Sequence, residues 1–492
     1  MKNKALRICA AILAVYLLLG VAFYFVAGDS LRLTKGSNET VTPKAPLAEL
    51  AQGDIISQTF RCNYDELESL TVIVGTMGRQ NTDMIKAQLF DSENHELTKP
   101  VYIYTADLKD NQAYVIAFES AIENVKGERL TLTLTSLNGI IGNSISFYYG
   151  TSVDVDTGRV TVPGEIRDTD ALFFNGERKV DSEKNPCYLC LTVKGTNYHW
   201  FGSHYWIVYA AGALLLALYL LYLSLCYRKQ KYGHLLAFLL SLKKYNFLIR
   251  QLVARDFKTK YKRSVLGMLW SFLNPLLTMS IQYVVFSTIF QSTIPNFVVY
   301  LLSGIICFNF FNEASSMCLV SIVGNATLIN KVYVPKYIYP FSRTLSSCIN
   351  LLLSLIPLLI MMLITQTPIT PAILLLPFAL IMLFLVSYGV GLILASMMVF
   401  FRDTQFLWGI FSMLLMYLTP IFYPENIIPS RFLAIYRLNP LYQVITFVRT
   451  LLIDGISPSP MAYLTCLLTC LVPFAIGVLV FRKTEDKFVL NI

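Results

Sequence analysis

Charge is scarce in this chain for its length. Of its 492 residues 14% are charged, whereas a soluble domain carries about 25% charged residues. This scarcity excludes a large soluble enzyme, and the 13% of aromatic residues excludes a disordered chain. No stretch matches the phosphate-binding loop G-x-x-x-x-G-K-[ST], so the chain has no nucleotide site of that kind.

Catalytic and metal-binding motifs are missing as well. The sequence contains neither H-E-x-x-H nor G-x-S-x-G, motifs that would indicate a zinc or serine enzyme. Residues 28–203 contain the cysteines Cys62, Cys187 and Cys190, which allow at most one disulfide. The C-x-x-C spacing of the last two lacks the second pair of a zinc set. We therefore expect no catalytic residue, metal or cofactor in this chain.

Long hydrophobic runs are abundant instead. A bilayer core about 30 Å thick requires roughly 20 apolar residues in a helix. Eight stretches reach or approach this length, at 8–27, 205–226, 266–290, 297–323, 341–365, 371–401, 406–423 and 460–481. The run 371–401 is longer than needed, and Gly389 and Gly391 suggest a tilt or a break within it.

Basic residues indicate the orientation of these runs. Lys2 and Arg7 precede the first run, the Lys- and Arg-rich segment 243–263 precedes the third, and Arg482 follows the last. Because such clusters favour the cytoplasmic side, alternating spans put both termini inside and residues 28–203 outside. The first run is alternatively a cleaved signal peptide, and both interpretations export residues 28–203.

The exported segment differs in composition from the rest of the chain. Residues 28–203 contain 16 Lys and Arg against 24 Asp and Glu, while the remainder contains 24 against 7. Short runs with period-two alternation, at 70–74, 87–90, 101–104, 114–118, 130–134 and 145–149, predict strands. Such spacing is typical of a β-sandwich, which we assign to residues 50–203 after a linker at 28–49.

Part of this sandwich resembles a known kind of module. The stretch from Gln58 through Gly78 to Asn111 resembles jelly-roll modules of bacterial envelope glycan proteins, which are similar to carbohydrate-binding modules. The resemblance implies contact with a glycan. From the residues alone, a sandwich that acts as a spacer or docks a partner remains the alternative.

The basic segment 243–263 has the pattern of an amphipathic helix. Ile249, Val253 and Phe257 recur every four residues, and the basic residues lie largely elsewhere on the helix, which suits the cytoplasmic membrane interface. The charges lie beside apolar runs, so we do not expect nucleic acid as a partner. The candidate interface residues are Arg250, Arg255, Phe257, Lys258 and Tyr261.

The half of the chain after this helix resembles the permeases of ABC exporters of polysaccharides, O-antigens and teichoic acids. Segment 266–276 (LGMLWSFLNPL) resembles the start of their first helix. Further segments match in order, namely 324–340 (GNATLINKVYVPKYIYP), 401–404 (FRDT), 419–424 (TPIFYP) and 439–441 (NPL). The match covers about residues 243–492 and leaves the role of the N-terminal half open.

The resemblance implies a fold and an activity. The fold class is a polytopic α-helical membrane protein of about eight spans with an inserted extracytoplasmic all-β sandwich. The expected parts are an anchor (1–27), linker, sandwich, second helix (204–227), interface helix, six-span permease (264–482) and cytoplasmic tail (483–492). The chain would act in the bacterial plasma membrane as a homodimer that exports a lipid-linked glycan, and a partner ATPase would hydrolyse ATP with magnesium.

The resemblance also suggests roles for residues of the permease half. Segment 324–340 corresponds to the coupling segment that contacts the ATPase, although a plain loop is the alternative. Its candidate residues are Asn325, Leu328, Lys331, Tyr333, Pro335 and Lys336. A carboxylate in hydrocarbon is costly, so Glu313 predicts an aqueous path or a packing contact. The candidate path residues are Tyr283, Phe308, Asn309, Asn312 and Glu313.

The apolar stretch 424–459 lies outside if the spans alternate, and we expect short gate helices there. The candidate outer-gate residues are Pro420, Phe422, Tyr423, Arg431, Asn439 and Pro440. Arg431, Arg437 and Arg449 either meet phosphate or sugar on exit or anchor to lipid head groups. Two other functions remain for the whole chain, a glycan-sensing receptor or scaffold and an envelope-glycan enzyme.

Overall fold

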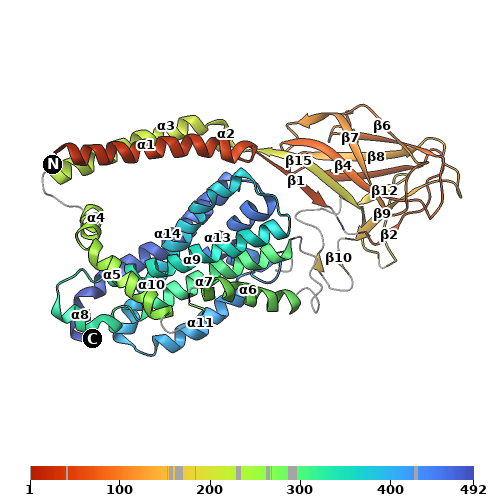
Figure 1. Ribbon diagram of the computed structural model, residues 1–492. Helices are drawn as coiled ribbons and strands as arrows, with labels where there is room; N and C mark the ends of the chain where they lie inside the picture. Colours follow the sequence, from red (N-terminus) through yellow and green to blue (C-terminus); the bar gives the residue numbers. More distant parts are fainter. Residues whose placement is uncertain are drawn as a thin grey trace. The chain divides into compact units, whose positions relative to one another are not determined.

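The computed structural model folds the chain into two compact units. Residues 1–31 and 204–492 form one unit, and residues 32–203 form the other (Figure 1). The structure describes residues 2–39, 41, 43–151, 153–154, 159–160, 170–182, 184–228, 234–261, 266–267, 269–285, 296–425 and 430–491.

Six described helices are long and apolar enough to cross a membrane. They are α1 (Lys2–Ala27), α3 (Tyr205–Arg228), α7 (Phe297–Leu319), α9 (Ile338–Ile364), α10 (Leu376–Phe400) and α14 (Pro460–Thr484). Two further predicted spans contain the described helices α6 (Leu269–Val284) and α11 (Thr404–Leu418), of 16 and 15 residues. At 1.5 Å per residue α11 reaches only about 23 Å. Residues 286–290 of the third predicted span lie outside the described residues.

Helix α7 lies at the centre of the permease half. It packs against α6, α9, α10, α11 and the short helix α13 (Pro440–Arg449). Its apolar residues are buried on all sides, as Val299, Leu301 and Leu302 are fully buried. By contrast α9 and α10 expose large apolar residues such as Leu352, Leu363 and Ile381, which is the pattern of helices that face lipid.

Two glycines allow α10 and α14 to pack closely. A Cβ added at Gly389 or at Gly477 would overlap the backbone of the facing helix, and one at Gly391 would lie 2.6 Å from the Cβ of Cys318 on α7. Helix α10 is continuous through these positions. The predicted break is therefore wrong, because the glycines bring the helices together, as small residues do in membrane proteins.

Helices α1 and α3, which precede and follow the sandwich in the sequence, form a pair that is held together by aromatic rings. The rings of Tyr16 and Tyr209 stack with centroids 5.4 Å apart. The Tyr205 hydroxyl donates to the carbonyl of Gly20 at 2.6 Å. The ring of Phe23 meets that of Tyr463 on α14 at 5.4 Å. This helix pair thus contacts the permease half through its own aromatic residues.

Residues 32–203 form a β-sandwich, as the alternating sequence predicts. One sheet has the order β1 (Leu33–Glu39), β15 (Leu191–Tyr198), β4 (Glu66–Gly75), β9 (Ser146–Thr151), β14 (Cys187–Leu189), with β7 (Gln112–Glu123) on β4 and β2 (Ala45–Pro46) on β9. The second has the order β13 (Glu177–Arg178), β12 (Leu172–Phe174), β3 (Ile55–Arg61), β8 (Arg129–Ser136), β5 (Met84–Phe90), β6 (Val101–Tyr104). Strands β10 (Val153–Asp154) and β11 (Arg159–Val160) form a separate pair. All six predicted strand runs lie in or overlap observed strands, and the apolar core includes residues of both larger sheets.

The predicted linker at 28–49 is wrong in part. Strand β1 pairs along its whole length with β15. Its sequence, LTKGSNE, has few apolar residues, so periodicity gives no strand signal, and backbone pairing holds the strand instead. No disulfide joins Cys62, Cys187 and Cys190, the cysteines of the sandwich, all of which are described. Burial raises the pKa of Cys187 to about 11, which keeps its thiol protonated and unreactive at neutral pH.

The helix contact at Gly389 and Gly477 gives a stability prediction. We expect Gly389→Val or Gly477→Val to separate α10 from α14, because inserting methyl groups into a packed contact costs about 1–3 kcal/mol. The measurement is the thermal unfolding of the detergent-purified protein. The control is Gly409→Val on α11, where an added Cβ meets nothing within 4 Å. Equal melting temperatures for all three variants would contradict the packing role.

Candidate functional site

The predicted interface helix is two helices in the structure. Helix α4 (His234–Lys244) ends before Tyr245, and α5 (Asn246–Tyr261) follows. The buried face of α5 comprises Ile249, Leu252 and Asp256, whose spacing of three and four residues is that of one helical face. The predicted apolar series was therefore displaced, since Val253 and Phe257 are only half-buried.

Helix α5 packs against helix α9, so it does not only face the membrane or solvent around the protein. Ile249 lies in an apolar cluster with Val334 and Ile338, and Leu252 in another with Tyr339. Three of the other predicted interface residues, Arg250, Arg255 and Lys258, are exposed, and Tyr261 is the last residue of α5.

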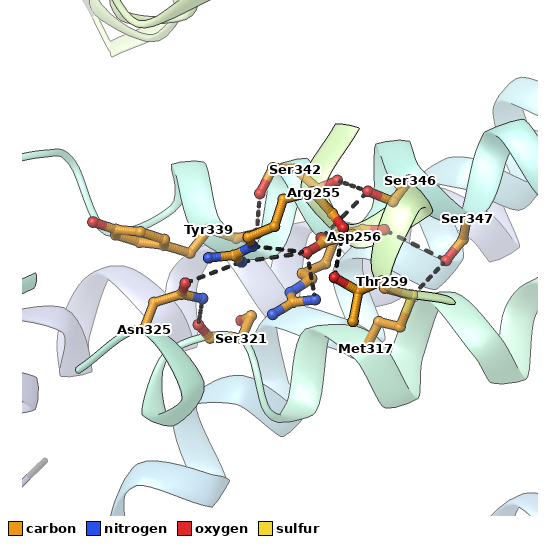
Figure 2. Close-up of polar contacts among 11 residues, drawn as sticks. Arg255, Asp256, Thr259, Met317, Ser321, Asn325, Tyr339, Ser342, Ser346 and Ser347 are labelled. Atoms are coloured by element: carbon orange, nitrogen blue, oxygen red, sulfur yellow. Dashed lines mark hydrogen bonds and ion pairs between the residues drawn. The ribbon is translucent and has the colours of Figure 1, made fainter. Parts of the chain in front are cut away.

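A buried carboxylate joins α5 to α9. The side chain of Asp256 is 3% exposed, and its Oδ1 lies 2.9 Å from Nη1 of Arg343 on α9. The Ser346 hydroxyl, one turn further along α9, donates to Oδ2 at 3.4 Å. Figure 2 shows Asp256 among these polar groups. A buried charge is stable only when it is paired and hydrogen-bonded, so α5 is held at this position on α9.

The same cluster reaches the predicted coupling segment. Arg255 lies 3.3 Å from Asp256 and donates from Nη2 to the side-chain oxygen of Asn325 at 3.3 Å. Asn325 is buried and donates to the carbonyl of Ser321 at 2.7 Å. Asn325 ends the short turn η4 (Val323–Asn325) and precedes α8 (Ala326–Lys331). The start of the coupling segment is thus hydrogen-bonded to α5 (Figure 2).

The rest of the coupling segment has one strongly exposed residue. Tyr333 is 94% exposed, although its carbonyl accepts a hydrogen bond from Tyr245 at 3.4 Å. Leu328 is half-buried among residues of α10 and α14, and Lys331 is exposed. Val332, the neighbour of Tyr333, is 50% exposed, and aromatic residues such as tyrosine are enriched at protein interfaces.

Lys336 is engaged within the chain. Its Nζ donates to the carbonyl of Glu485 and lies 5.8 Å from the ring centroid of Phe488. Pro335 precedes it and is half-buried. The C-terminal helix α15 (Phe488–Asn491) therefore lies beside the coupling segment, and Figure 1 shows α8 and the C-terminus at the same end of this unit.

A polar groove begins next to this cluster. It has a volume of about 580 Å³ and is lined by Arg255, Asp256, Thr259, Lys260, Glu313, Met317, Gly324 and Arg343. A smaller cavity of about 120 Å³ shares Lys260 and Glu313 with it and also contacts α6. Glu313 accepts from Lys260 at 2.8 Å and from Asn350 of α9 at 2.6 Å. The carboxylate on α7 thus faces a polar groove.

The other predicted path residues lie in different surroundings. Asn309 also lines the smaller cavity, and Asn312 is half-buried. Tyr283 on α6 is 40% exposed. Phe308 is 4% exposed and lies in the apolar core of the bundle. The structure therefore brings Asn309 and Glu313 together at the smaller cavity and leaves Phe308 in the core.

A buried arginine organises the predicted outer gate. Arg449, at the end of α13, donates to the carbonyls of Pro420, Ile421 and Tyr300 at 2.7, 2.9 and 3.2 Å. Its guanidinium carbon lies 3.4 Å from the ring centroid of Tyr300. With 8% of Arg449 exposed, lipid anchoring is wrong for this residue. Ligand contact on exit stays a prediction, because Arg449 also lines a cavity of about 260 Å³.

The remaining gate residues surround this arginine or begin α13. The Tyr423 carbonyl accepts from the Tyr300 hydroxyl at 2.7 Å, and Phe422 is 6% exposed. Asn439 caps α13 by accepting from the Leu441 amide at 3.0 Å, and Pro440 is the first residue of the helix. Arg431 lies on the short helix α12 (Ser430–Arg437). The expected short helices are therefore present in 424–459.

The sequence analysis missed Asp256 and Arg343. Asp256 is the one acidic residue in the basic segment 243–263, and this isolation was an available signal for a specific partner. Arg343 and Ser346 lie one turn apart on α9 and looked like topology signals or ordinary polar residues. Only the fold places them opposite Asp256.

Removal of the carboxylate tests the cluster. We expect Asp256→Ala to destabilise the docking of α5 on α9 by about 3–5 kcal/mol, because it leaves Arg343 in a buried site without its counter-ion. The measurement is limited proteolysis within α5 on the detergent-purified protein. Lys258→Ala, on the exposed side of the same helix, is the matched control. Equal cleavage rates in the two variants would show that the ion pair does not hold α5.

Comparison with known proteins agrees with this arrangement. Residues 248–453 match the ABC-2 type transporter membrane family. The O-antigen export system permease protein RfbA of Klebsiella pneumoniae is 31% identical over 237 residues, which is 48% of this chain and 90% of the relative. RfbA of Myxococcus xanthus is 31% identical over 41% of this chain and 78% of the relative. The polysialic acid transport protein KpsM of Escherichia coli is 25% identical over 48% of this chain and 93% of the relative. The chain therefore belongs to the permeases of the ABC-2 type transporters.

Proposed function

We propose that this chain is the permease subunit of an ATP-driven exporter of a lipid-linked cell-envelope polysaccharide or teichoic acid. The observation that carries the proposal is the 31% identity to an O-antigen export permease over 90% of that relative. The second relative named for a glycan, the polysialic acid transport protein, supports the same class of substrate. The proposed location is the bacterial plasma membrane with both termini inside.

A separate ATPase chain provides the energy in this proposal. The sequence has no phosphate-binding loop of its own, so ATP and magnesium bind to the partner. Tyr333 is the proposed docking residue, because its 94% exposed side chain lies on a segment that is otherwise fixed to the bundle. Lys336 supports the segment from the side of the C-terminal helix.

The contacts of Asp256 explain how motion of the ATPase reaches the spans. The coupling segment is joined to α5 through Arg255 and Asn325, and α5 is joined to α9 through Asp256 and Arg343. A displacement of the coupling segment therefore acts on the span α9 through these side-chain contacts. This is the rigid-body type of transition by which transporters change between inward- and outward-open states.

The groove beside Glu313 is the proposed inner part of the translocation path. Its lining contains both charges of the Lys260–Glu313 pair, which can form hydrogen bonds with the hydroxyl groups of a sugar chain. One chain presents only one wall, so we propose that a second copy completes the path. At the other end, α13 and Arg449 close it until the bundle moves.

Substitution of Tyr333 tests ATPase docking. We expect Tyr333→Ala to reduce co-purification of the ATPase at least about tenfold, which corresponds to 1.4 kcal/mol, because a large exposed contact is lost without disturbing the bundle. The measurement is a pull-down with the ATPase expressed from the same operon region. Asn330→Ala, exposed on the same segment and not among the candidate coupling residues, is the control. Undiminished ATPase recovery with Tyr333→Ala would reject the docking role.

Depletion of the chain tests the function itself. We expect cells without it to keep the lipid-linked glycan inside and to lose it from the surface, because the path across the membrane is absent. The measurement is glycan content in intact and in permeabilised cells. Normal surface glycan in depleted cells would exclude export as the function.

A further inference from the structure

The outer face of the six-stranded sheet is unlike a generic solvated surface. Its central strand β8 presents Thr131, Thr133 and Thr135 outward, and Ser57 and Thr59 of β3 lie beside them in register. The Thr59 and Thr131 hydroxyls are 2.9 Å apart. The outer side of these strands therefore carries neighbouring hydroxyl groups, which donate and accept hydrogen bonds. We call these five residues the threonine field.

Two tyrosines and a lysine border this field at the edge strand β6. Tyr102 and Tyr104 point outward from β6 and are 45% and 66% exposed. Tyr102 is paired in register with Lys86 of β5, and Lys86 with Thr135 of β8. Beyond the backbone pairing of these strands, no side-chain hydrogen bond or ion pair engages Lys86, Tyr102 or Tyr104 in the described part of the chain. We call these three residues the tyrosine–lysine patch.

The charge of this face is opposite to that of its domain. None of the outward positions on β3, β5, β6 and β8, all of which are described, is Asp or Glu. Two carboxylates outside these strands are engaged by residues of the face, Glu96 by Gln88 at 2.7 Å and Asp170 by Arg129 at 3.1 Å. The sandwich as a whole has an excess of acidic residues, so the basic face is local.

The other sheet provides the contrast. Its outer positions on β4 include Glu66 and Glu68, and Glu66 lies in register with Glu123 of β7. Its exposed tyrosine, Tyr198, is 55% exposed but is hydrogen-bonded to Glu66 at 2.5 Å. The two faces of one sandwich thus differ in charge and in whether their exposed tyrosines are already engaged.

We propose that the tyrosine–lysine patch binds a polysaccharide chain that carries acidic groups. The tyrosine rings offer apolar faces to sugar rings while their hydroxyls remain wet. The threonine field supplies hydrogen bonds along the chain, and Lys86 supplies a compact positive charge for a carboxylate or phosphate. The inference rests on the proposed function, because the exported glycan is what the sandwich meets outside the membrane.

The test uses the full chain in lipid nanodiscs. The probe is the acidic envelope polysaccharide extracted from the source strain and immobilised at its reducing end, with dextran as a neutral probe. We expect the wild type to bind the acidic probe and not dextran. We expect Tyr102→Ala/Tyr104→Ala to lose at least about tenfold in affinity, and Lys86→Gln to weaken binding and its salt dependence. Tyr198→Ala is the matched control.

Each outcome separates the inference from the function. The inference is supported if Tyr198→Ala binds as the wild type does and the variants of the tyrosine–lysine patch lose binding. All variants must keep the wild-type unfolding temperature. Equal loss in all variants, equal binding of dextran, or no binding by a wild-type chain that still exports glycan in cells overturns the inference. If cells without the chain export normally, the proposed function fails whatever the nanodiscs bind.

Discussion

The ion pair between Asp256 and Arg343 is the interaction on which the rest of the permease half depends. Both charges are withdrawn from water, with 3% of the aspartate and 19% of the arginine side chain exposed. Such a pair is weak evidence for stability, but breaking it by removing one partner is costly. It therefore specifies one position of α5 on α9. The coupling segment follows this position, because Arg255 links Asp256 to Asn325.

Arg449 has the corresponding role near α13. It is bonded to three carbonyl oxygens of two other segments, so α13 moves with the residues 420–421 and with α7. Between the two clusters, close helix contacts such as Gly389 on Gly477 transmit displacement with little deformation. The bundle then behaves as rigid parts held by a few buried charges, which is what an externally driven transporter requires.

Patterns repeated along the chain predicted much of the fold, whereas single contacts did not. Period-two alternation marked the strands from β4 to β9, and apolar runs marked the spans. Strand β1 was missed because its polar sequence carries no period and its partner β15 lies about 160 residues away. The family motifs suggested the coupling segment, whose contact with an ATPase stays a prediction. They could not show that Lys336 binds the C-terminal helix or that Arg449 is buried, because both facts depend on residues that only the fold brings close.

The central claim is that α5, the coupling segment and α9 move as one body. Spin labels at the exposed positions Lys258 and Thr327 report the distance between α5 and α8, and one label per copy at Leu438, 73% exposed, reports the outer gate. The account predicts that trapping the ATPase with ATP and vanadate changes the Leu438 distance and leaves the Lys258–Thr327 distance unchanged. A changed Lys258–Thr327 distance with a constant Leu438 distance would contradict it.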